Sequence, residues 1–400
     1  MGINYAPEPS GIAPYSTRIA EGLRSRGHDV RVLTTFPHYP QWRVADGYSG
    51  LRQRESRGDV DVRRLRHYVP RRPDGVRRAA SEVSFGLHAS LRGWGRPDVV
   101  ICPSPALLSS AAARIRTRAA FGLQIQDLYS AGVIETGGSR HVANALGRLE
   151  ASVARRSTGV AVIHDRFRDR VVERLGVEPG RVRVIRNWTH VSTPPVLDEV
   201  AIRARLGWGD DFVVLHTGAM GRKQGLENVA RTARLAEQRD LPLRFVLMGD
   251  GGQRPELERM AAGVRTLQFV DPLPNEEYAQ ALHAADSLLV NELPGLVEMA
   301  VPSKLTSYLK TGRPVVAATG AGTTTADELA AAGAGIRVQP DSPEDLLTAL
   351  LSLRAEPERA AALGAHGPAY CERVLSESKA LDSYDEWIHE LVDLHQSRKD

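Results

Sequence analysis

The 400-residue sequence predicts an α/β protein built from two Rossmann-like, doubly wound domains that face a cleft. Short apolar runs alternate with amphipathic helical segments along most of the chain, which is typical of parallel sheets covered by helices. A chain of 400 residues also exceeds what one hydrophobic core usually serves. The alternation breaks at Thr193-Pro194-Pro195, where consecutive prolines favour a linker between two domains.

In the first half, the pattern predicts a helix over residues 12–26 that ends at Gly27, a residue typical of helix C-termini. The expected strands of this half are 30–33, 98–101, 159–163 and 182–185. In the second half, we expect strands at 212–217, 244–248, 264–270, 287–290, 315–318 and 335–338. Helices are expected from 226 and 255, and over 376–395. The predicted domains are therefore 1–193 and 194–375, followed by a C-terminal helical segment, 376–400.

The composition is that of an ordinary globular enzyme, with 42% hydrophobic and 25% charged residues. No apolar run reaches about 18 residues, so we expect no transmembrane helix. The first residues lack the basic and apolar layout of a signal peptide. The two cysteines, Cys102 and Cys371, have no metal-ligand spacing. We therefore expect a reduced, cytoplasmic protein that needs no cofactor and no metal.

The segment from Arg52 to Arg78 is unusually basic. It carries ten arginines against four acids, Glu55, Asp59, Asp61 and Asp74. Such a segment attracts an anionic membrane surface or an anionic acceptor. The alternative is a solvated surface in an arginine-biased chain that has only five lysines. No aromatic-interleaved motif accompanies it, so we expect no nucleic-acid partner.

The most informative segment is 301–318, in which Pro302-Ser303-Lys304 begins a short helix that Gly312-Arg313-Pro314 ends. Ser303 suits the N-cap position. Lys304 stands in the first turn, where the helix dipole disfavours cations unless an anion is bound there. Because helix N-termini are common phosphate sites, this segment predicts a nucleotide-diphosphate ligand.

Three further loops of the second half follow predicted strands. Residues 217–225 combine Gly221 with Arg222 and Lys223, so that a phosphate could approach the backbone and be neutralised. The alternative is an ordinary glycine turn with surface cations. Gly249 begins a second glycine-rich turn, which is a weak signal alone. The loop from Phe269 to Leu273 is rich in proline and could offer backbone groups to a flat base, or form a simple strand-to-helix turn.

Polar residues of the first half also follow apolar runs. Gly11 precedes the first predicted helix, His38 lies in a Pro-His-Tyr-Pro loop, and Asp127 follows Gln126. His38 and Asp127 are the polar groups best placed for work on an acceptor. Structural capping is the alternative for each of them.

Together, these motifs resemble those of retaining glycosyltransferases of the GT-B fold, family 4. The resemblance is closest to the bacterial branch that builds colanic acid, O-antigen and related polysaccharides, including L-fucosamine transferases. The motifs are NYAPEPSGIAPY at 4–15, RGHDV at 26–30, PHYP at 37–40, NW at 187–188, GRKQGL at 221–226, GDG at 249–251, PSKL at 302–305 and GRPV at 312–315. They span nearly the whole chain in the family's order.

The resemblance implies a role for each region. Residues 1–193 would bind the acceptor and residues 194–375 the donor, while the C-terminal helix would cross back to the first domain. Arg222 and Lys223 would bind the donor diphosphate, and the helix start at 302–304 a phosphate or the ribose. The implied donor-side set is Gly11, Gly221, Arg222, Lys223, Gly249, Phe269, Leu273, Glu298, Ser303, Lys304 and Ser307. The implied acceptor-side set is His38, Gln126 and Asp127, and the catalytic set is Asp127, Arg222 and Lys223.

The chain departs from the family in two places. Many members carry a Glu-x7-Glu motif, whose carboxylates contact the donor sugar and the ribose. Counting back from Gly312, its two positions fall on Met299 and Ser307, and Glu298 lies one position out of register. The family's acceptor-side histidine maps near Gln126. The chain also begins within the first expected strand, so we expect either that this strand is short or that the start of the chain is misassigned.

The implied reaction moves a hexosyl or N-acetylhexosaminyl group from a nucleotide diphosphate, with UDP expected, to a hydroxyl of a lipid-linked or saccharide acceptor. Anomeric configuration is retained.

Asp59-Val60-Asp61 has the Asp-x-Asp pattern of a metal ligand pair, but we expect a solvated loop there. We expect a cytoplasmic enzyme of polysaccharide biosynthesis, peripheral at the inner membrane face. The alternatives are a nucleotide-sugar epimerase of the same fold and a non-catalytic nucleotide-sugar-binding partner.

Overall fold

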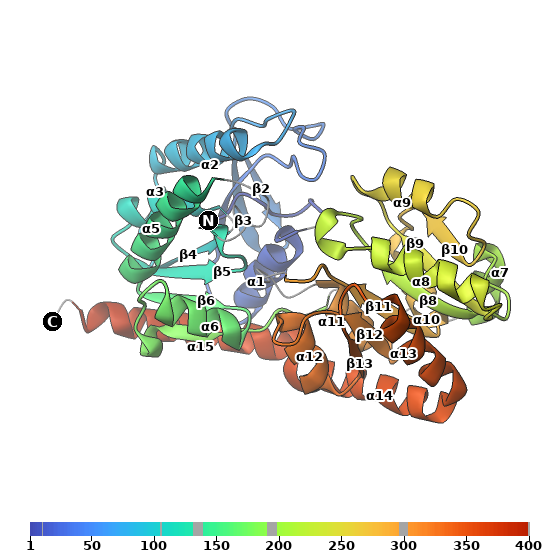
Figure 1. Cartoon of the computed structure of the whole chain (residues 1–400). Coiled ribbons are helices and arrows are strands. Elements are labelled where there is room, and N and C mark those ends of the chain that lie inside the picture. Colours follow the sequence, from blue (N-terminus) through green and yellow to red (C-terminus); the bar gives the residue numbers. More distant parts are fainter. Residues whose placement is uncertain (10, 105, 131–138, 190–197, 296–302, 399–400) are drawn as a thin grey trace. The chain divides into compact units, whose positions relative to one another are not determined.

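The computed structural model describes residues 1–9, 11–104, 106–130, 139–189, 198–295 and 303–398. The chain divides into two compact units (Figure 1). The N-terminal unit comprises Met1–Asn187 together with Glu377–Asp400, and the C-terminal unit comprises Trp188–Ser376. The predicted joint at residues 193–195 lies outside the described residues.

The N-terminal unit contains two sheets. The first has the order β1-β3-β2, in which β1 (Arg31–Thr35) runs parallel to β3 (Val60–Leu65), and β2 (Arg52–Arg57) pairs antiparallel with β3. The second is parallel and has the order β4-β5-β6-β7. Its strands are β4 (Val99–Ser104), β5 (Ala120–Ile125), β6 (Gly159–Val162) and β7 (Val182–Val184).

The first residues of the chain bridge these two sheets. The amino group of Met1 donates to the carbonyl of Ile101 in β4 at 2.7 Å. The amide of Gly2 donates to the carbonyl of Leu33 in β1 at 3.1 Å. This short extended segment therefore occupies the position of the expected first strand, between β1 and β4.

Helices surround the sheets of this unit: α1 (Ala13–Ser25), α2 (Gly75–Ser90), α3 (Leu107–Arg116), α5 (Arg140–Arg156), α6 (Asp165–Glu173) and α15 (Glu377–Gln396). The C-terminal helix α15, the red helix in Figure 1, packs on β5 and β4 and on α1. Its side chains Trp387 and Leu391 lie against glycines of the sheet, since a Cβ on Gly122 or Gly159 would come within 2.7 or 2.8 Å of them. The packing therefore depends on a smooth glycine surface.

The C-terminal unit contains one six-stranded parallel sheet in the order β10-β9-β8-β11-β12-β13. The strands are β8 (Phe212–Thr217), β9 (Leu243–Met248), β10 (Leu267–Val270), β11 (Ser287–Asn291), β12 (Val315–Ala318) and β13 (Gly335–Val338). Numbered within the unit, this is the 3-2-1-4-5-6 order of a dinucleotide-binding sheet. The strand order reverses between β8 and β11, and ligands bind such sheets at that crevice, beyond the carboxyl ends of the strands.

Helices cover both faces of this sheet: α7 (Glu199–Leu206), α8 (Glu227–Gln238), α9 (Arg254–Met260), α10 (Asn275–Ala284), α11 (Ser303–Lys310), α12 (Thr324–Ala332), α13 (Pro343–Ala355) and α14 (Pro357–Val374). Successive strand residues join opposite cores. Leu215 belongs to the hydrophobic cluster that contains Tyr308, whereas Val214 belongs to the cluster that contains Phe245. Burial on both faces explains why these strands form continuous apolar runs in the sequence.

The predicted elements are largely confirmed. The strands at 212–217, 315–318 and 335–338 have the expected bounds, and the helix predicted over 12–26 is α1. The strand expected over 264–270 is shorter and begins at Leu267.

The expectation of a solvated loop at residues 59–61 is confirmed for Asp59, which lies in an exposed turn, and is wrong for Asp61. These residues belong to the β2–β3 hairpin, with Asp61 inside β3. Burial acts to raise the pKa of Asp61, but hydrogen bonds from Arg54 and Arg31 bring it below its ordinary value. Asp61 is therefore committed to ion pairs within the sheet.

The basic segment from Arg52 to Arg78 is also less exposed than its composition suggests. Arg64 is buried, donates to the carbonyl of Thr35 at 3.1 Å and pairs with Glu55. It therefore stabilises the sheet instead of contributing to a surface patch. No helix within the described residues has both the length and the apolar character needed to cross a membrane.

Candidate functional site

The candidate site of the C-terminal unit is centred on Lys304, in the first turn of α11. Its Nζ lies 3.1 Å from Nε2 of His216 in β8. The Nδ1 atom of His216 lies 3.0 Å from the carbonyl of Leu289 in β11. Since a carbonyl can only accept, Nδ1 carries the proton and Nε2 accepts from the Lys304 ammonium. The lysine is thus held at the carboxyl end of β8, beside the crevice where the strand order reverses.

The electrostatic setting of Lys304 is unusual. Burial lowers its pKa to about 8, and the nearby Glu292 carboxylate opposes this shift only partly. Burial, together with the positive Lys304, also holds the pKa of His216 well below its ordinary value. His216 is therefore neutral, and Lys304 is a desolvated cation. An anionic ligand would compensate for the interactions with water that the ammonium has lost on burial.

Glycines allow the loops after β8 and β9 to run in contact. The amide of Gly218 donates to the carbonyl of Met248 at 2.9 Å, and that of Met220 to Asp250 at 2.8 Å. Gly249 has φ of +145°, and a Cβ there would lie 2.0 Å from the Gly218 carbonyl oxygen. The glycine-rich turn that begins at Gly249 therefore packs its backbone against the loop after β8 and holds that loop in position.

The 221–225 turn is fixed to the end of β11. Residues Arg222–Gln224 form a short 3-10 helix, η2, and the side-chain amide of Asn291 donates to the carbonyls of Gln224 and Gly225 at 2.8 and 2.9 Å. The amide of Leu293 donates to the carbonyl of Lys223 at 3.0 Å. Arg222 is exposed on this turn. These hydrogen bonds fix the turn, so that Arg222 is presented beside the carboxyl end of β11.

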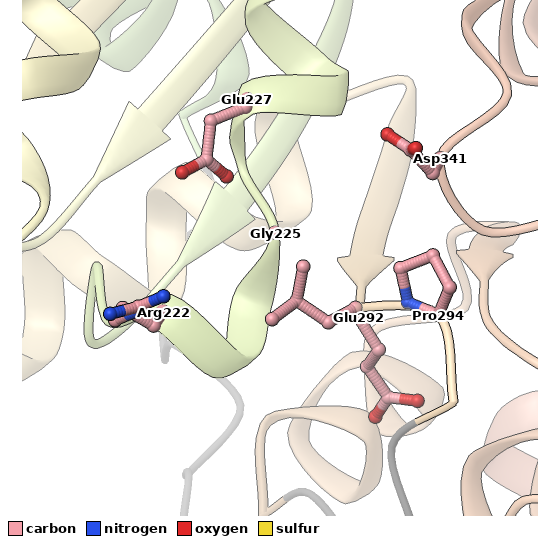
Figure 2. A pocket seen from close by; sticks show the side chains of 7 residues that line it. Arg222, Gly225, Glu227, Glu292, Pro294 and Asp341 are labelled. Carbon is pink, nitrogen blue, oxygen red and sulfur yellow. The ribbon is translucent and has the colours of Figure 1, made fainter. Parts of the chain in front are cut away.

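A pocket of about 260 Å³ opens between this turn and the residues that follow β11. Figure 2 shows Arg222 on one side and Glu292 and Pro294 on the other. The lining residues are Arg222, Gly225, Glu227, Glu292, Leu293, Pro294 and Asp341. Glu292 is buried and accepts a hydrogen bond from Thr325 at 2.7 Å and another from Thr319. Glu292 therefore lines the pocket and also interacts electrostatically with Lys304.

The two serines of α11 have local roles. Ser303 is the first residue of the helix instead of the predicted N-cap, and its carbonyl accepts from the Ser307 hydroxyl at 3.3 Å. Ser307 is buried and lies 3.4 Å from the Thr189 hydroxyl. The family motif would place a carboxylate at this position, which the structure fills with a short hydroxyl. Glu298 lies outside the described residues.

Phe269 and Leu273 do not converge. Phe269 packs against the hydrophobic cluster on one face of the sheet, and Leu273 against the cluster on the other. Both side chains are partly buried in these cores. These two side chains therefore serve the cores, and the expected contact of the loop backbone with a base stays a prediction.

In the N-terminal unit, a buried carboxylate organises the loops that hold Gly11 and His38. One oxygen of Glu8 accepts from the amides of His38 and Tyr39 at 2.8 and 2.9 Å. Gly11 has φ of +67°, and its Cβ position lies 3.5 Å from the Tyr39 ring. Burial lowers the pKa of His38, against the influence of Glu8. The structure therefore brings Gly11 and His38 into one loop cluster.

Gln126 and Asp127 belong to a second network. The side-chain amides of Gln126 and Asn187 bond to each other at 2.7 and 3.2 Å. The carbonyl of Asp127 accepts from Ser104 at 3.3 Å.

Two buried glutamates fix the loop that follows Asp127. Glu150 accepts from the amide of Tyr129 at 2.7 Å, and Glu82 accepts from the Tyr129 hydroxyl. Burial raises the pKa of Glu82 to about 7. These glutamates hold the backbone beside Asp127 in place.

Sequence reasoning missed four residues that organise these sites: Glu8, His216, Asn291 and Glu292. His216 and Lys304 are 88 residues apart, so no local spacing connects them. Asn291 and Glu292 were the easiest of the four to predict, because they are the first two residues after the predicted strand at 287–290. A polar residue at that end of a parallel strand is a site candidate by its position alone.

Two domain families match the chain. Residues 10–188 match the glycosyl transferase 4-like domain, and residues 211–356 match the glycosyl transferases group 1. The chain belongs to this glycosyltransferase family and has its GT-B fold of two Rossmann-like domains. It is similar to WcaI of Escherichia coli K12, which is named as a colanic acid biosynthesis glycosyl transferase. The two are 31% identical over 404 residues, which cover 96% of this chain and 97% of WcaI.

Solved structures agree with the fold. Sucrose-phosphate synthase from Thermosynechococcus elongatus matches with a TM-score of 0.72 and 18% identity, over 98% of this chain and 99% of that one. Anabaena HepE in complex with UDP matches with a TM-score of 0.69 and 16% identity, over 96% and 98% of the two chains. At these identities, the likeness establishes architecture alone.

Proposed function

We propose that the protein transfers a sugar from a nucleotide-diphosphate donor, UDP-linked, to a hydroxyl of a lipid-linked or saccharide acceptor, with retention of configuration. The transfer belongs to cell-surface polysaccharide biosynthesis. The observation that carries the proposal is the enclosed Lys304 ammonium against neutral His216, beside the crevice where the strand order reverses. WcaI, the relative that matches over nearly the whole chain, is named for a polysaccharide pathway, which supports the biosynthetic context.

The proposed mechanism relies on stabilising the leaving group. As the bond to the sugar breaks, negative charge grows on the diphosphate oxygens. Lys304 and the exposed Arg222 would lie against these oxygens, and fixed cations in a poorly solvated site stabilise such charge without reorganising. The departing oxygen would take the acceptor's proton on the same face of the sugar. No strong general base is required.

Glu292 provides a carboxylate that the Glu-x7-Glu positions lack. It stands beside the 221–225 turn and interacts electrostatically with Lys304. Each of its oxygens accepts one hydroxyl hydrogen bond from Thr319 or Thr325, and a carboxylate oxygen can accept a second. We propose that Glu292 accepts hydrogen bonds from donor hydroxyls.

A ligand screen tests the donor assignment. The thermal unfolding of the full chain would be followed with UDP-, GDP- and dTDP-sugars at equal concentration. We expect UDP-sugars to raise the unfolding temperature most, because ligand that binds only the folded state stabilises it by mass action. A larger rise with GDP- or dTDP-sugars would overturn the choice of base, and no rise with any of them would overturn the donor site.

Donor affinity should weaken as the pH rises through about 8. The pKa of Lys304 is lowered to about 8, so the side chain loses its charge above that pH and no longer attracts the diphosphate. Below it, the ammonium is protonated and affinity should be steady. Calorimetric titration with UDP between pH 7 and 9.5 measures the profile. Lys304→Arg, which stays charged throughout, should flatten it; an equal decline in this variant would exclude Lys304 as the titrating group.

We also propose that the N-terminal unit docks on an anionic membrane surface through α2. Along this helix and its C-cap, Val76, Val83, Leu87 and Leu91 recur at helical spacing, and their side chains are exposed. Exposed arginines lie at its start, at positions 71, 72, 77 and 78. An apolar stripe next to cations is the pattern of a helix that lies in the membrane interface. A lipid-linked acceptor would be reached from such a surface.

The double substitution Leu87→Asp/Leu91→Asp should weaken binding to vesicles that contain anionic lipid by at least about tenfold, since each leucine contributes on the order of 1.5 kcal/mol or more when buried. Co-sedimentation measures the partition. Val200→Asp, on an equally exposed valine of α7, is the control and should bind as the parent does. Vesicle binding that responds neither to salt nor to anionic lipid would contradict the proposed docking.

A further inference from the structure

We propose that His28, Asp385 and His389 form a binding site for a first-row transition metal ion, zinc in the first instance, which ties α15 to the turn after α1. All three residues belong to the N-terminal unit, and each offers one ligand atom. These three atoms lie within 4.8 Å of one another. The site is separate from the residues assigned to sugar transfer, so the proposal of a metal site does not depend on that assignment.

Two ordered elements supply the ligands. Asp385 and His389 are four residues apart on α15, and residues at this spacing lie next to each other on one helix face. The helix is anchored by Tyr384, Trp387 and Leu391, which are buried. His28 follows Gly27, whose φ is +96°, and its amide donates to the carbonyl of Leu23 at 3.2 Å. The ligands are therefore positioned before any ion binds.

The distances suit a tetrahedral ion after small side-chain movements. Nε2 of His28 lies 2.5 Å from Oδ1 of Asp385, and Nε2 of His389 lies 3.8 Å from the same oxygen. Zinc bonds of about 2.0–2.1 Å place tetrahedral ligands about 3.3 Å apart. The first distance must lengthen and the second shorten, each by less than about 1 Å on that geometry, and the ligand nitrogens of the two histidines, within 4.8 Å of each other, must approach by up to about 1.5 Å. Rotation of the exposed His389 side chain can bring its nitrogen closer to both other ligands, whereas the lengthening between His28 and Asp385 requires movement of one of those two side chains.

The ligand types select the kind of metal. Two imidazole nitrogens and one carboxylate suit zinc, copper and nickel, whereas calcium and magnesium require oxygen ligands. The His389 side chain is 70% exposed, which leaves room for water as a fourth ligand.

The surrounding charges leave Asp385 available. The ion pairs described for Asp385 are with the two histidines alone. The neighbouring Arg26 pairs instead with Asp382, one turn earlier on α15. The guanidinium of Arg24 donates to the backbone carbonyl of His28 at 3.2 Å. The carboxylate is therefore not neutralised by an arginine and can share its charge with a metal ion.

The test uses the full chain without a histidine tag, stripped with EDTA and held at pH 7.5, where free imidazole is mostly neutral. Competition with a chromophoric chelator measures zinc binding. We expect one strongly bound ion per chain. Excess zinc should raise the unfolding temperature by roughly 5 °C or more, as expected for a ligand at about a hundred times its dissociation constant. EDTA should reverse the rise.

Variants separate this site from other histidines. His389→Ala removes an exposed ligand with little risk to the fold and should lower zinc affinity at least tenfold. Asp385→Asn should do the same. His141→Ala, at an exposed histidine of α5, is the control and should retain full binding. Undiminished zinc uptake by His389→Ala, or an unfolding temperature of the parent chain that zinc leaves unchanged, would overturn the proposal.

Discussion

Replacing Lys304 with methionine should lower the affinity for UDP by roughly 10- to 150-fold, which corresponds to about 1.5–3 kcal/mol for a charged hydrogen bond. Methionine keeps most of the side-chain volume but removes the ammonium that His216 and the end of β8 hold in place. Because Lys304 is buried, we expect little water to take the place of its ammonium in the variant, so that the diphosphate would lose the contact without compensation. Calorimetric titration with UDP gives the measurement.

Lys310→Met is the matched control, since it removes the same charge from the other end of α11. Its affinity for UDP should remain within about twofold of the parent, as expected for a charge away from the ligand. Both variants should unfold at similar temperatures. If Lys304→Met binds UDP as tightly as Lys310→Met does, Lys304 does not contact the donor.

Replacing Gly249 with alanine should destabilise the C-terminal unit by about 2–4 kcal/mol and disable donor binding. The added Cβ would lie 2.0 Å from the Gly218 carbonyl oxygen, so the loops after β8 and β9 must separate. The backbone at Gly249, with φ of +145°, is also one that alanine rarely adopts. Separation would move Gly218, whose Cβ position lies 3.6 Å from Nζ of Lys304.

Gly252→Ala provides the comparison, because a Cβ at Gly252 meets no atom within 4 Å. This variant should unfold and bind UDP as the parent does. Urea unfolding and UDP titration of both variants separate the effect of the close approach from that of losing a glycine. Equal stability of the two variants would show that the loops tolerate separation.

The C-terminal sheet was predictable because its strands are buried on both faces. Each appears in the sequence as an apolar run, and the run at 212–217 coincides with β8. The β2–β3 hairpin was missed for the opposite reason. Strand β2 has the sequence RQRESR and is exposed along almost its whole length, so it carries no hydrophobic pattern.

The candidate site divides in the same way. Lys304 could be recognised locally, because a cation in the first turn of a helix indicates an anion. His216 and Glu8 could not, because their importance comes from partners distant in sequence. Glu8 is 30 residues from the His38 amide that it accepts from, and no periodicity relates the two. From the sequence alone, a histidine within an apolar strand such as His216 is interpreted as a core residue, because its partner Lys304 is not known.

The most direct test of the central claim follows a labelled sugar from a UDP-sugar into membrane lipid or saccharide acceptors, with the anomeric configuration of the product read by NMR. We predict a glycosylated acceptor that keeps the donor's configuration, together with release of UDP, and greatly reduced transfer by Lys304→Met. A donor that is epimerised without acceptor, or bound without turnover across these acceptors, would contradict sugar transfer as the function of this protein.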